Sequence, residues 1–388
     1  MSKYLFLSCI GWIFFVSGFA QSRKISVEDG KKFLTHLETL YNDRSSWEQR
    51  KTELVPCFRQ ALDLSPLPEK PASKTILTPK RKYAGYTVEN FAIETLPGIY
   101  VCGSIYKPAK MKVKNPVMLN PNGHFPGGRY REDQQKRCAM EARMGMIAAS
   151  WDLFAWGESL LQFDSTQHRT SAAQTIQTLN AIRILDYLLS MKEADSSRVG
   201  ITGGSGGGSL TMMMSAIDQR ITLSVPVVML SSHFNGGCPC ESGRPVHSCG
   251  NGTNNAEIAA LFAPKPLLII SDGKDWTSTV PELEFPFIKR IYGFYQAEDN
   301  VKNVHFPEEG HDYGISKRLA MYEFVSGHFG LDTRAVKDKE GHFDESKVTI
   351  EKEEMMYVFG TKGENLLSNA IKGEEKLKNL LNELGIKN

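Results

Sequence analysis

Apolar residues recur along this chain with two periods, one typical of strands and one typical of helices. Between residues 117 and 329, short apolar runs of strand length alternate with longer segments whose apolar positions follow a helical spacing. The predicted strands are 117–120, 146–151, 199–201, 223–230, 267–271 and 301–306, and the predicted helices are 129–144, 171–189, 210–216, 255–262, 281–295 and 315–329. Such alternation predicts a mostly parallel central sheet with helices on both faces, which is an α/β fold.

The segments that flank this region follow other patterns. Residues 27–64 carry apolar side chains at helical spacing and predict two helices, which end before Pro66. Residues 86–93 and 99–106 predict two paired strands joined by a turn, and the charged tail ends in one further predicted helix. We therefore expect a leader at 1–20, an N-terminal helical segment at 21–75, an α/β catalytic domain at 76–331 and a C-terminal extension at 332–388.

The N-terminus resembles a cleavable secretory signal. Lys3 precedes an apolar run from residue 4 to residue 19, and small residues stand at Gly18 and Ala20. The run is shorter than the ~20 residues that a spanning helix needs, so we expect no stable membrane insertion. These features predict a secreted or periplasmic protein whose mature chain starts near Gln21.

Charge excludes one class of partner. The 46 Lys and Arg residues nearly balance the 44 Asp and Glu residues, for a net charge of +2, and the two signs are mixed along the chain. Because binding of nucleic acid requires a basic patch or stripe, no nucleic-acid partner is expected. Nothing in the sequence indicates an oligomeric state.

A glycine-rich turn carries the strongest indication of chemistry. The apolar strand at 199–201 runs into Gly203-Gly-Ser205-Gly-Gly207, and an apolar helix follows. This Gly-x-Ser-x-Gly arrangement is typical of the nucleophile elbow of an α/β-hydrolase, with Ser205 as the nucleophile. A dinucleotide fingerprint would need a glycine at Ser209, and a phosphate-binding loop would need Lys there, so both are excluded.

A serine nucleophile needs a histidine base and an acid, which follow it in chain order in this fold. His311 lies in a glycine-flanked loop between a predicted strand and a predicted helix, which makes it the candidate base. Asp275 and Asp272 both follow the strand at 267–271, and we favour Asp275 because it lies further into the loop. Asp272 remains the alternative acid. If it is not the acid, its side chain is expected to cap the turn.

The loop after strand 117–120 is where this fold supplies one donor to the oxyanion hole. We expect the backbone N–H of Gly206 to be one donor and that of His124 or Phe125 to be the other.

Cysteines crowd a second loop. Cys238, Cys240 and Cys249 lie close together around His247. Zinc is conceivable there, but Cys-x-Cys is not the usual zinc-knuckle spacing, so we predict a disulfide that joins Cys238 or Cys240 to Cys249, and no metal or other cofactor.

These motifs together resemble secreted bacterial acetyl-xylan-esterase-like α/β-hydrolases. The resemblance extends from about residue 47 to residue 331 and rests on the Asn122-Gly-His-Phe loop, the Trp151-Asp-Leu-Phe-Ala-Trp-Gly-Glu158 segment, the elbow, the stretch from Asn254 to Trp276, and Gly310-His-Asp-Tyr313. It implies that Ser205, Asp275 and His311 form the catalytic triad. It also implies a carbohydrate esterase, without fixing the ester.

We therefore expect a serine carboxylester hydrolase that removes acyl groups, in the first place acetyl, from polysaccharides or oligosaccharides. Trp151 and Trp276 could stack on sugar rings, and Arg129 could hold a uronate carboxylate, which would favour a methylesterase acting on pectin-like esters instead. A serine peptidase and a catalytically inactive sugar-binding protein are less favoured alternatives. The peptidase would need a larger gating domain, and the binder would not need the triad residues.

Overall fold

A computed structural model describes residues 24–387, and its centre is a 10-stranded mixed sheet. The strands follow the spatial order β1-β3-β4-β6-β5-β7-β8-β9-β10, with β2 paired to β3. Their bounds are β1 Ile76–Leu77, β2 Arg81–Tyr83, β3 Tyr86–Leu96, β4 Ile99–Pro108, β5 Asn115–Pro121, β6 Ile147–Trp151, β7 Ala194–Gly204, β8 Leu223–Val227, β9 Leu267–Asp272 and β10 Val301–Phe306. All pairs from β6 to β10 are parallel, whereas β1 to β4 and the β4–β6 pair are antiparallel.

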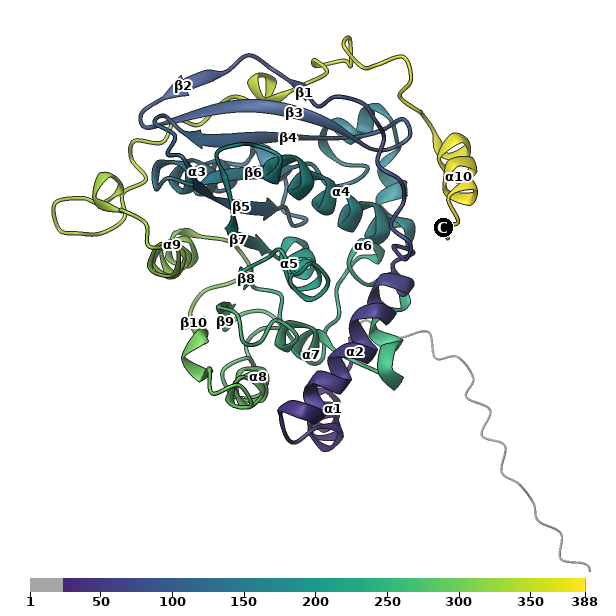
Figure 1. The fold of residues 1–388 in the computed structure, drawn as a ribbon, viewed down its shortest axis with the longest axis vertical. Coiled ribbons are helices and arrows are strands. Elements are labelled where there is room, and N and C mark those ends of the chain that lie inside the picture. The colour runs from purple at the N-terminus through teal and green to yellow at the C-terminus, as the bar shows by residue number, and fades with distance from the viewer. Residues whose placement is uncertain (1–23, 388) are drawn as a thin grey trace, which may run out of the picture.

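Helices cover both faces of this sheet (Figure 1). Their bounds are α1 Val27–Leu40, α2 Arg44–Ala61, α3 Glu132–Arg143, α4 Ala172–Leu189, α5 Gly206–Ile217, α6 Pro239–Ser242, α7 Asn255–Ala260, α8 Glu284–Gly293, α9 Ile315–Phe329 and α10 Glu374–Glu383. Helices α3 and α9 pack on one face, and α4, α5, α7 and α8 pack on the other. The predicted mostly parallel α/β fold is confirmed, with the carboxyl ends of the parallel strands at one edge, where ligands bind in such sheets.

The two N-terminal helices are joined to the body of the protein by a disulfide. Cys57 in α2 bonds to Cys249, 192 residues further along the chain. The predicted bridge from Cys238 or Cys240 to Cys249 is therefore wrong, because those two thiols are free and buried. Short spacing made the local pair easy to form, but the fold brings α2 against the loop that holds Cys249, and that contact decides the pairing.

We expect the double substitution Cys57→Ser/Cys249→Ser to lower the free energy of unfolding. Cross-linking residues so far apart removes conformational entropy from the unfolded chain, an effect of roughly 2–5 kcal/mol. Urea unfolding of the wild-type protein and the variant measures the difference, and a reducing agent should destabilise only the wild-type protein. Equal stability of the oxidised and reduced wild-type protein would contradict this expectation.

The end of the chain returns across the antiparallel part of the sheet before α10 (Figure 1). Glu345 forms a buried ion pair with Arg318, and Glu351 pairs with Arg81. Farther along, the backbone N–H groups of Val358 and Phe359 donate to the Glu158 carboxylate. The C-terminal extension therefore belongs to the same packed body as the sheet.

The predicted leader at 1–20 lies outside the described residues. Between residues 24 and 387, no helix has the length and apolar character needed to cross a membrane.

Candidate active site

Ser205 stands between β7 and α5 in a backbone conformation that few residues adopt. Its φ of 56° and ψ of −124° place it outside the regions usual for a residue with a side chain, as the sharp turn of a nucleophile elbow requires. A Cβ at Gly203 would lie 2.6 Å from the backbone of Gly207, and a Cβ at Gly207 would lie 2.4 Å from the carbonyl oxygen of Pro121. Glycine is needed at both positions because the strand, the helix and the neighbouring loop pass so close together.

The loops after β9 and β10 bring the predicted base and acid together. His311 Nδ1 lies 2.7 Å from Asp275 Oδ2, and Asp275 Oδ1 accepts hydrogen bonds of 2.6 Å from both the backbone and the hydroxyl of Thr277. Burial raises the pKa of Asp275, but the hydrogen bonds from His311 and Thr277 outweigh it and hold this pKa below its ordinary value. The carboxylate can therefore orient the imidazole and stabilise its protonated form.

Asp272, the alternative acid, faces a different partner. Its side chain is fully buried with Oδ2 at 3.5 Å from Lys317 Nζ, and Oδ1 accepts from the backbone of Lys274. Burial and the nearby Asp275 carboxylate raise the pKa of Asp272 to about 6, against the opposing effect of Lys317. Of the two candidates, the structure brings Asp275 and not Asp272 to the imidazole.

The loop after β5 packs directly on the elbow. A Cβ at Gly123 would lie 3.0 Å from Ser205 Cβ, and one at Gly206 would lie 2.8 Å from the His124 ring. Within residues 24–387, the N–H groups of Gly206, His124 and Phe125 form no backbone hydrogen bond of the turns, loops and helix caps. These are the three predicted donors of the oxyanion hole, and their amides are available to a developing oxyanion.

A cavity of about 540 Å³ opens at Ser205. Its lining combines aromatic rings with polar and charged groups, namely His124, Trp156, Ser165, His168, Arg169, Ser205, Phe234, Gly237, Cys238, Glu241 and Trp276. The Trp276 ring also contacts the His311 ring in a tilted arrangement, with ring centres 4.4 Å apart. A space of this size accommodates a small ligand, up to about the bulk of a sugar ring, next to Ser205.

The predicted sugar-contacting residues divide between the cavity and the interior. Trp276 lines the cavity, whereas Trp151 is a buried core residue of β6 with 1% exposure. Arg129 is equally buried, and its guanidinium pairs with Asp152 at 2.9 Å and with Glu158 at 2.8 Å. Arg129 is therefore committed to a structural ion-pair network, and the expectation that it meets a uronate is corrected.

Sequence reasoning missed Arg169, His168 and Glu241 as cavity residues. Arg169 and His168 come from a short 3-10 helix, Ser165–Arg169, that no apolar periodicity marks, and Glu241 lies in α6 beside the cysteines. No local signal in the chain identifies them, because only the tertiary fold brings these turns to Ser205.

Cys238 lies in the wall of the same cavity, and Cys240 lies behind it, with both thiols close to the imidazoles of His124 and His168. Hydrogen bonding from Cys240, followed by that from His124 and His168, holds the pKa of Cys238 far below its ordinary value, whereas burial raises the pKa of Cys240. His247, which sequence proximity placed with these cysteines, instead pairs with Asn255 at 3.0 Å.

The comparisons with known proteins agree with this architecture. A family model described as acetyl xylan esterase (AXE1) matches residues 175–242, from α4 through the elbow to α6. None of the curated proteins matches the sequence significantly. A likeness of fold alone connects the chain to two glucuronoyl esterases. One, from Solibacter usitatus, has a TM-score of 0.53 and 16% identity over 74% of this chain and 94% of that chain. The other, from Teredinibacter turnerae, has a TM-score of 0.52 and 12% identity over 78% of this chain and 100% of that chain.

The fold and these relationships define a carboxylic ester hydrolase of the α/β-hydrolase type. The solved structure of methylesterase BT1017 superposes with a TM-score of 0.89 and is 51% identical, over 94% of this chain and 82% of that chain. The chain belongs to the family of this methylesterase, among the acetyl-xylan-esterase-like carbohydrate esterases.

Proposed function

We propose that the protein is an exported methylesterase that hydrolyses methyl esters of uronate residues in polysaccharides or oligosaccharides. The observation that carries this proposal is the 51% identity to methylesterase BT1017 over nearly the whole chain. Removal of acetyl groups is the second candidate, favoured by the acetyl xylan esterase family model.

The proposed reaction uses the three residues at the strand ends. His311 takes the proton of the Ser205 hydroxyl as its oxygen attacks the ester carbonyl, and Asp275 stabilises the imidazolium that forms. The amides of Gly206 and of His124 or Phe125 stabilise the oxyanion. The C–O bond to the methoxy group then breaks, and methanol leaves with the proton from His311. Water, activated by the same histidine, hydrolyses the uronoyl-serine ester and releases the uronate and free Ser205.

The shape and charge of the cavity support a uronate over an acetyl group on the acyl side. In a methylesterase the sugar itself stays bonded to the serine in the intermediate, so the space beside Ser205 has to hold a ring. The cavity of about 540 Å³ with Trp156, Phe234 and Trp276 in its wall offers that space. Arg169 places a positive charge at the same wall, where the free carboxylate of a neighbouring uronate would be attracted.

A substrate panel tests the proposal. Methyl-esterified oligogalacturonides and acetylated xylo-oligosaccharides are incubated with the full mature chain, and methanol and acetate are measured. We expect methanol release to dominate. Acetate release without methanol would overturn the proposal in favour of the deacetylase.

Export is tested by Edman sequencing of the protein recovered outside the cytoplasm. We expect its first residue to lie near Gln21.

Replacement of Arg169 tests the charge argument separately. Because its side chain is exposed, Arg169→Gln should cost about 0.5–1 kcal/mol of binding, a roughly 2- to 5-fold rise in KM for oligouronide methyl esters. The kcat should stay near the wild-type value, and an uncharged aryl ester should show no change. Arg334→Gln is the matched control because Arg334 is highly exposed and pairs with Asp332 away from the cavity lining. An equal rise in KM for the uncharged ester would contradict the charge argument.

A further inference from the structure

Four side chains with metal-binding atoms converge beside the cavity of about 540 Å³ at Ser205, called the ester cavity below. The ligand atoms of His124, His168, Cys238 and Cys240 all lie within 4.8 Å of one another. His124 Nε2 lies 2.8 Å from His168 Nε2 and 3.0 Å from Cys240 Sγ. Ligand atoms at about 2.0–2.3 Å from a tetrahedral zinc ion lie roughly 3.3–3.8 Å from one another. The distances between the ligand atoms of this cluster run from 2.8 Å up to 4.8 Å and include that range.

Both imidazoles turn Nε2 towards the cluster and Nδ1 away from it. His168 Nδ1 lies 2.7 Å from the carbonyl oxygen of Phe154, and since a carbonyl only accepts, Nδ1 carries the proton. His124 Nδ1 lies 3.7 Å from a carboxylate oxygen of Glu241. A carbonyl or carboxylate behind the outer ring nitrogen is the arrangement that orients metal-binding histidines. The Nε2 lone pair of His168 therefore faces His124 Nε2, and one metal ion between the two rings would bind both Nε2 atoms once His124 carries its proton on Nδ1.

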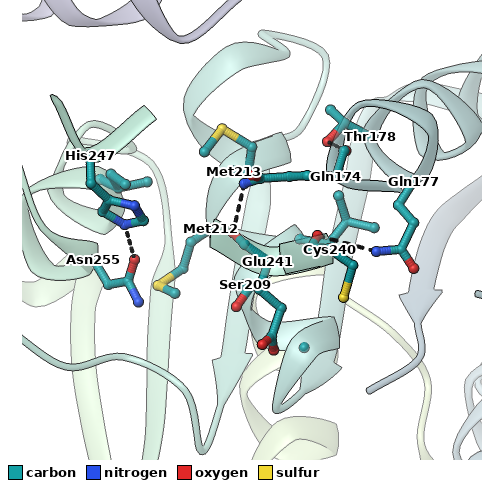
Figure 2. Close-up of a pocket in the computed structure, with 13 residues that line it drawn as sticks. Gln174, Gln177, Thr178, Ser209, Met212, Met213, Cys240, Glu241, His247 and Asn255 are labelled. Atoms are coloured by element: carbon teal, nitrogen blue, oxygen red, sulfur yellow. Dashed lines mark hydrogen bonds between the residues drawn. The ribbon is translucent and has the colours of Figure 1, made fainter. Parts of the chain in front are cut away.

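The backbone that carries the two cysteines is held by hydrogen bonds from side chains of α4 and from Glu241. Gln174 donates to the carbonyl oxygen of Glu241 at 2.6 Å, and Gln177 donates to that of Cys240 at 3.3 Å (Figure 2). The Glu241 carboxylate accepts from the backbone N–H groups of Gly237 and Cys238. Helix α4 and Glu241 thus fix α6 and its two sulfur atoms before any ligand binds, which lowers the entropic cost of binding.

We propose that His124, His168, Cys238 and Cys240 bind one Zn²⁺ ion at the wall of the ester cavity. Two thiolates with two imidazoles form a ligand set that zinc favours, with tetrahedral geometry and no open position. Both sulfur atoms bind as thiolates, so any thiol proton still present passes to solvent on binding, and the two thiolate charges neutralise the ion. The site goes beyond the proposed function, because it takes no part in the hydrolysis.

The proposed site differs from the expectation that the protein binds no metal, and its ligands differ from the zinc ligands that sequence proximity suggested. Cys249 and His247 do not contribute to it, since the former is in the disulfide with Cys57 and the latter pairs with Asn255. A disulfide between Cys238 and Cys240 is the competing arrangement. It would consume both sulfur ligands and leave the two facing Nε2 atoms without a cation.

The ion would join three segments that are distant in sequence. His124 belongs to the loop that offers the oxyanion donors, His168 to the 3-10 helix beside Arg169, and the cysteines to the start of α6. Both His124 and Cys238 also line the ester cavity. We infer that zinc holds these walls at a fixed separation around the substrate.

Metal analysis of the full mature chain tests the proposal. The protein is produced with added zinc, dialysed, and its metal content is measured by mass spectrometry. We expect about one zinc per chain in the wild-type protein and in Ser205→Ala, so that the result does not depend on esterase activity. Cys238→Ser/Cys240→Ser should lose the zinc at least ~10-fold. Cys138→Ser, which alters a buried free cysteine in α3, is the matched control and should retain it.

A second measurement covers the case in which the double variant fails to fold. Wild-type protein reconstituted with Co²⁺ should develop the visible absorption of tetrahedral cobalt and the near-ultraviolet absorption of cobalt–thiolate bonds. A chelator should lower the Tm of the zinc-loaded protein. The proposal would be overturned if the wild-type chain contained no zinc and formed a Cys238–Cys240 disulfide. Zinc that remains bound in the double variant would also contradict it, as would a cobalt-loaded protein that lacks cobalt–thiolate absorption.

Discussion

Ser205→Ala should lower the turnover number at least ~10³-fold while the protein folds normally, because removal of a triad member leaves only binding and the oxyanion hole to assist hydrolysis. The assay follows an aryl acetate together with a methyl-esterified oligouronide, and the unfolding transition checks the fold. Ser209→Ala, one turn further along α5, is the matched control, since its hydroxyl has no hydrogen-bond partner within residues 24–387 and it lies outside the ester cavity lining. Retention of most activity by Ser205→Ala would remove Ser205 from the mechanism.

Chemical labelling of Ser205 distinguishes an active serine enzyme from an inactive sugar-binding protein. A fluorophosphonate should label the wild-type chain at Ser205 and leave Ser205→Ala unlabelled. Absence of labelling in the folded wild-type chain would favour the binding protein.

Asp275→Asn should lower the turnover number by about 10⁴-fold with little change in KM, because an amide at this position favours the wrong tautomer of His311 and cannot stabilise its charge. The 2.7 Å contact between Asp275 Oδ2 and His311 Nδ1 makes this effect specific to one of the two neighbouring acids. Steady-state kinetics of the purified variant, with its unfolding curve as a check on folding, provide the measurement.

Asp272→Asn is the matched comparison. This substitution removes a buried charge partner of Lys317, which still contacts Glu309 and Asp312, so we expect a loss of roughly 1–3 kcal/mol in stability and less than ~10-fold in turnover. A larger loss of turnover in Asp272→Asn than in Asp275→Asn would transfer the role of the acid to Asp272.

Local patterns in the sequence were sufficient to predict those parts of the structure that depend on residues close together in the chain. The alternation of apolar runs predicted the strands and helices of the parallel half, and the glycines around Ser205 predicted the sharp turn, since close packing there tolerates no side chain. His311 and Asp275 could be located because Asp275 follows the buried strand β9 and His311 follows the neighbouring edge strand β10, and parallel strands present their carboxyl ends at one edge.

Contacts between distant segments could not be predicted in this way. The burial of Arg129 depends on Asp152 and Glu158, and the partner of Cys249 lies 192 residues earlier in the chain. His168 gave no sign of meeting Cys238 and Cys240, because its position is set by how a short 3-10 helix packs against α6. A single sequence records spacing along the chain, whereas these pairings depend on the geometry of packing.

The C-terminal extension has a consequence for how far the chain can be shortened. Arg318 and Arg81 belong to the catalytic body, but their carboxylate partners, Glu345 and Glu351, lie beyond residue 331. A chain shortened at residue 331 would lack both carboxylates, and removal of one partner from a buried ion pair such as Arg318–Glu345 costs several kcal/mol where the remaining charge stays buried. Native packing around α9 and β2 therefore depends on residues beyond 331, and a catalytic fragment shortened there is a poor starting point for engineering.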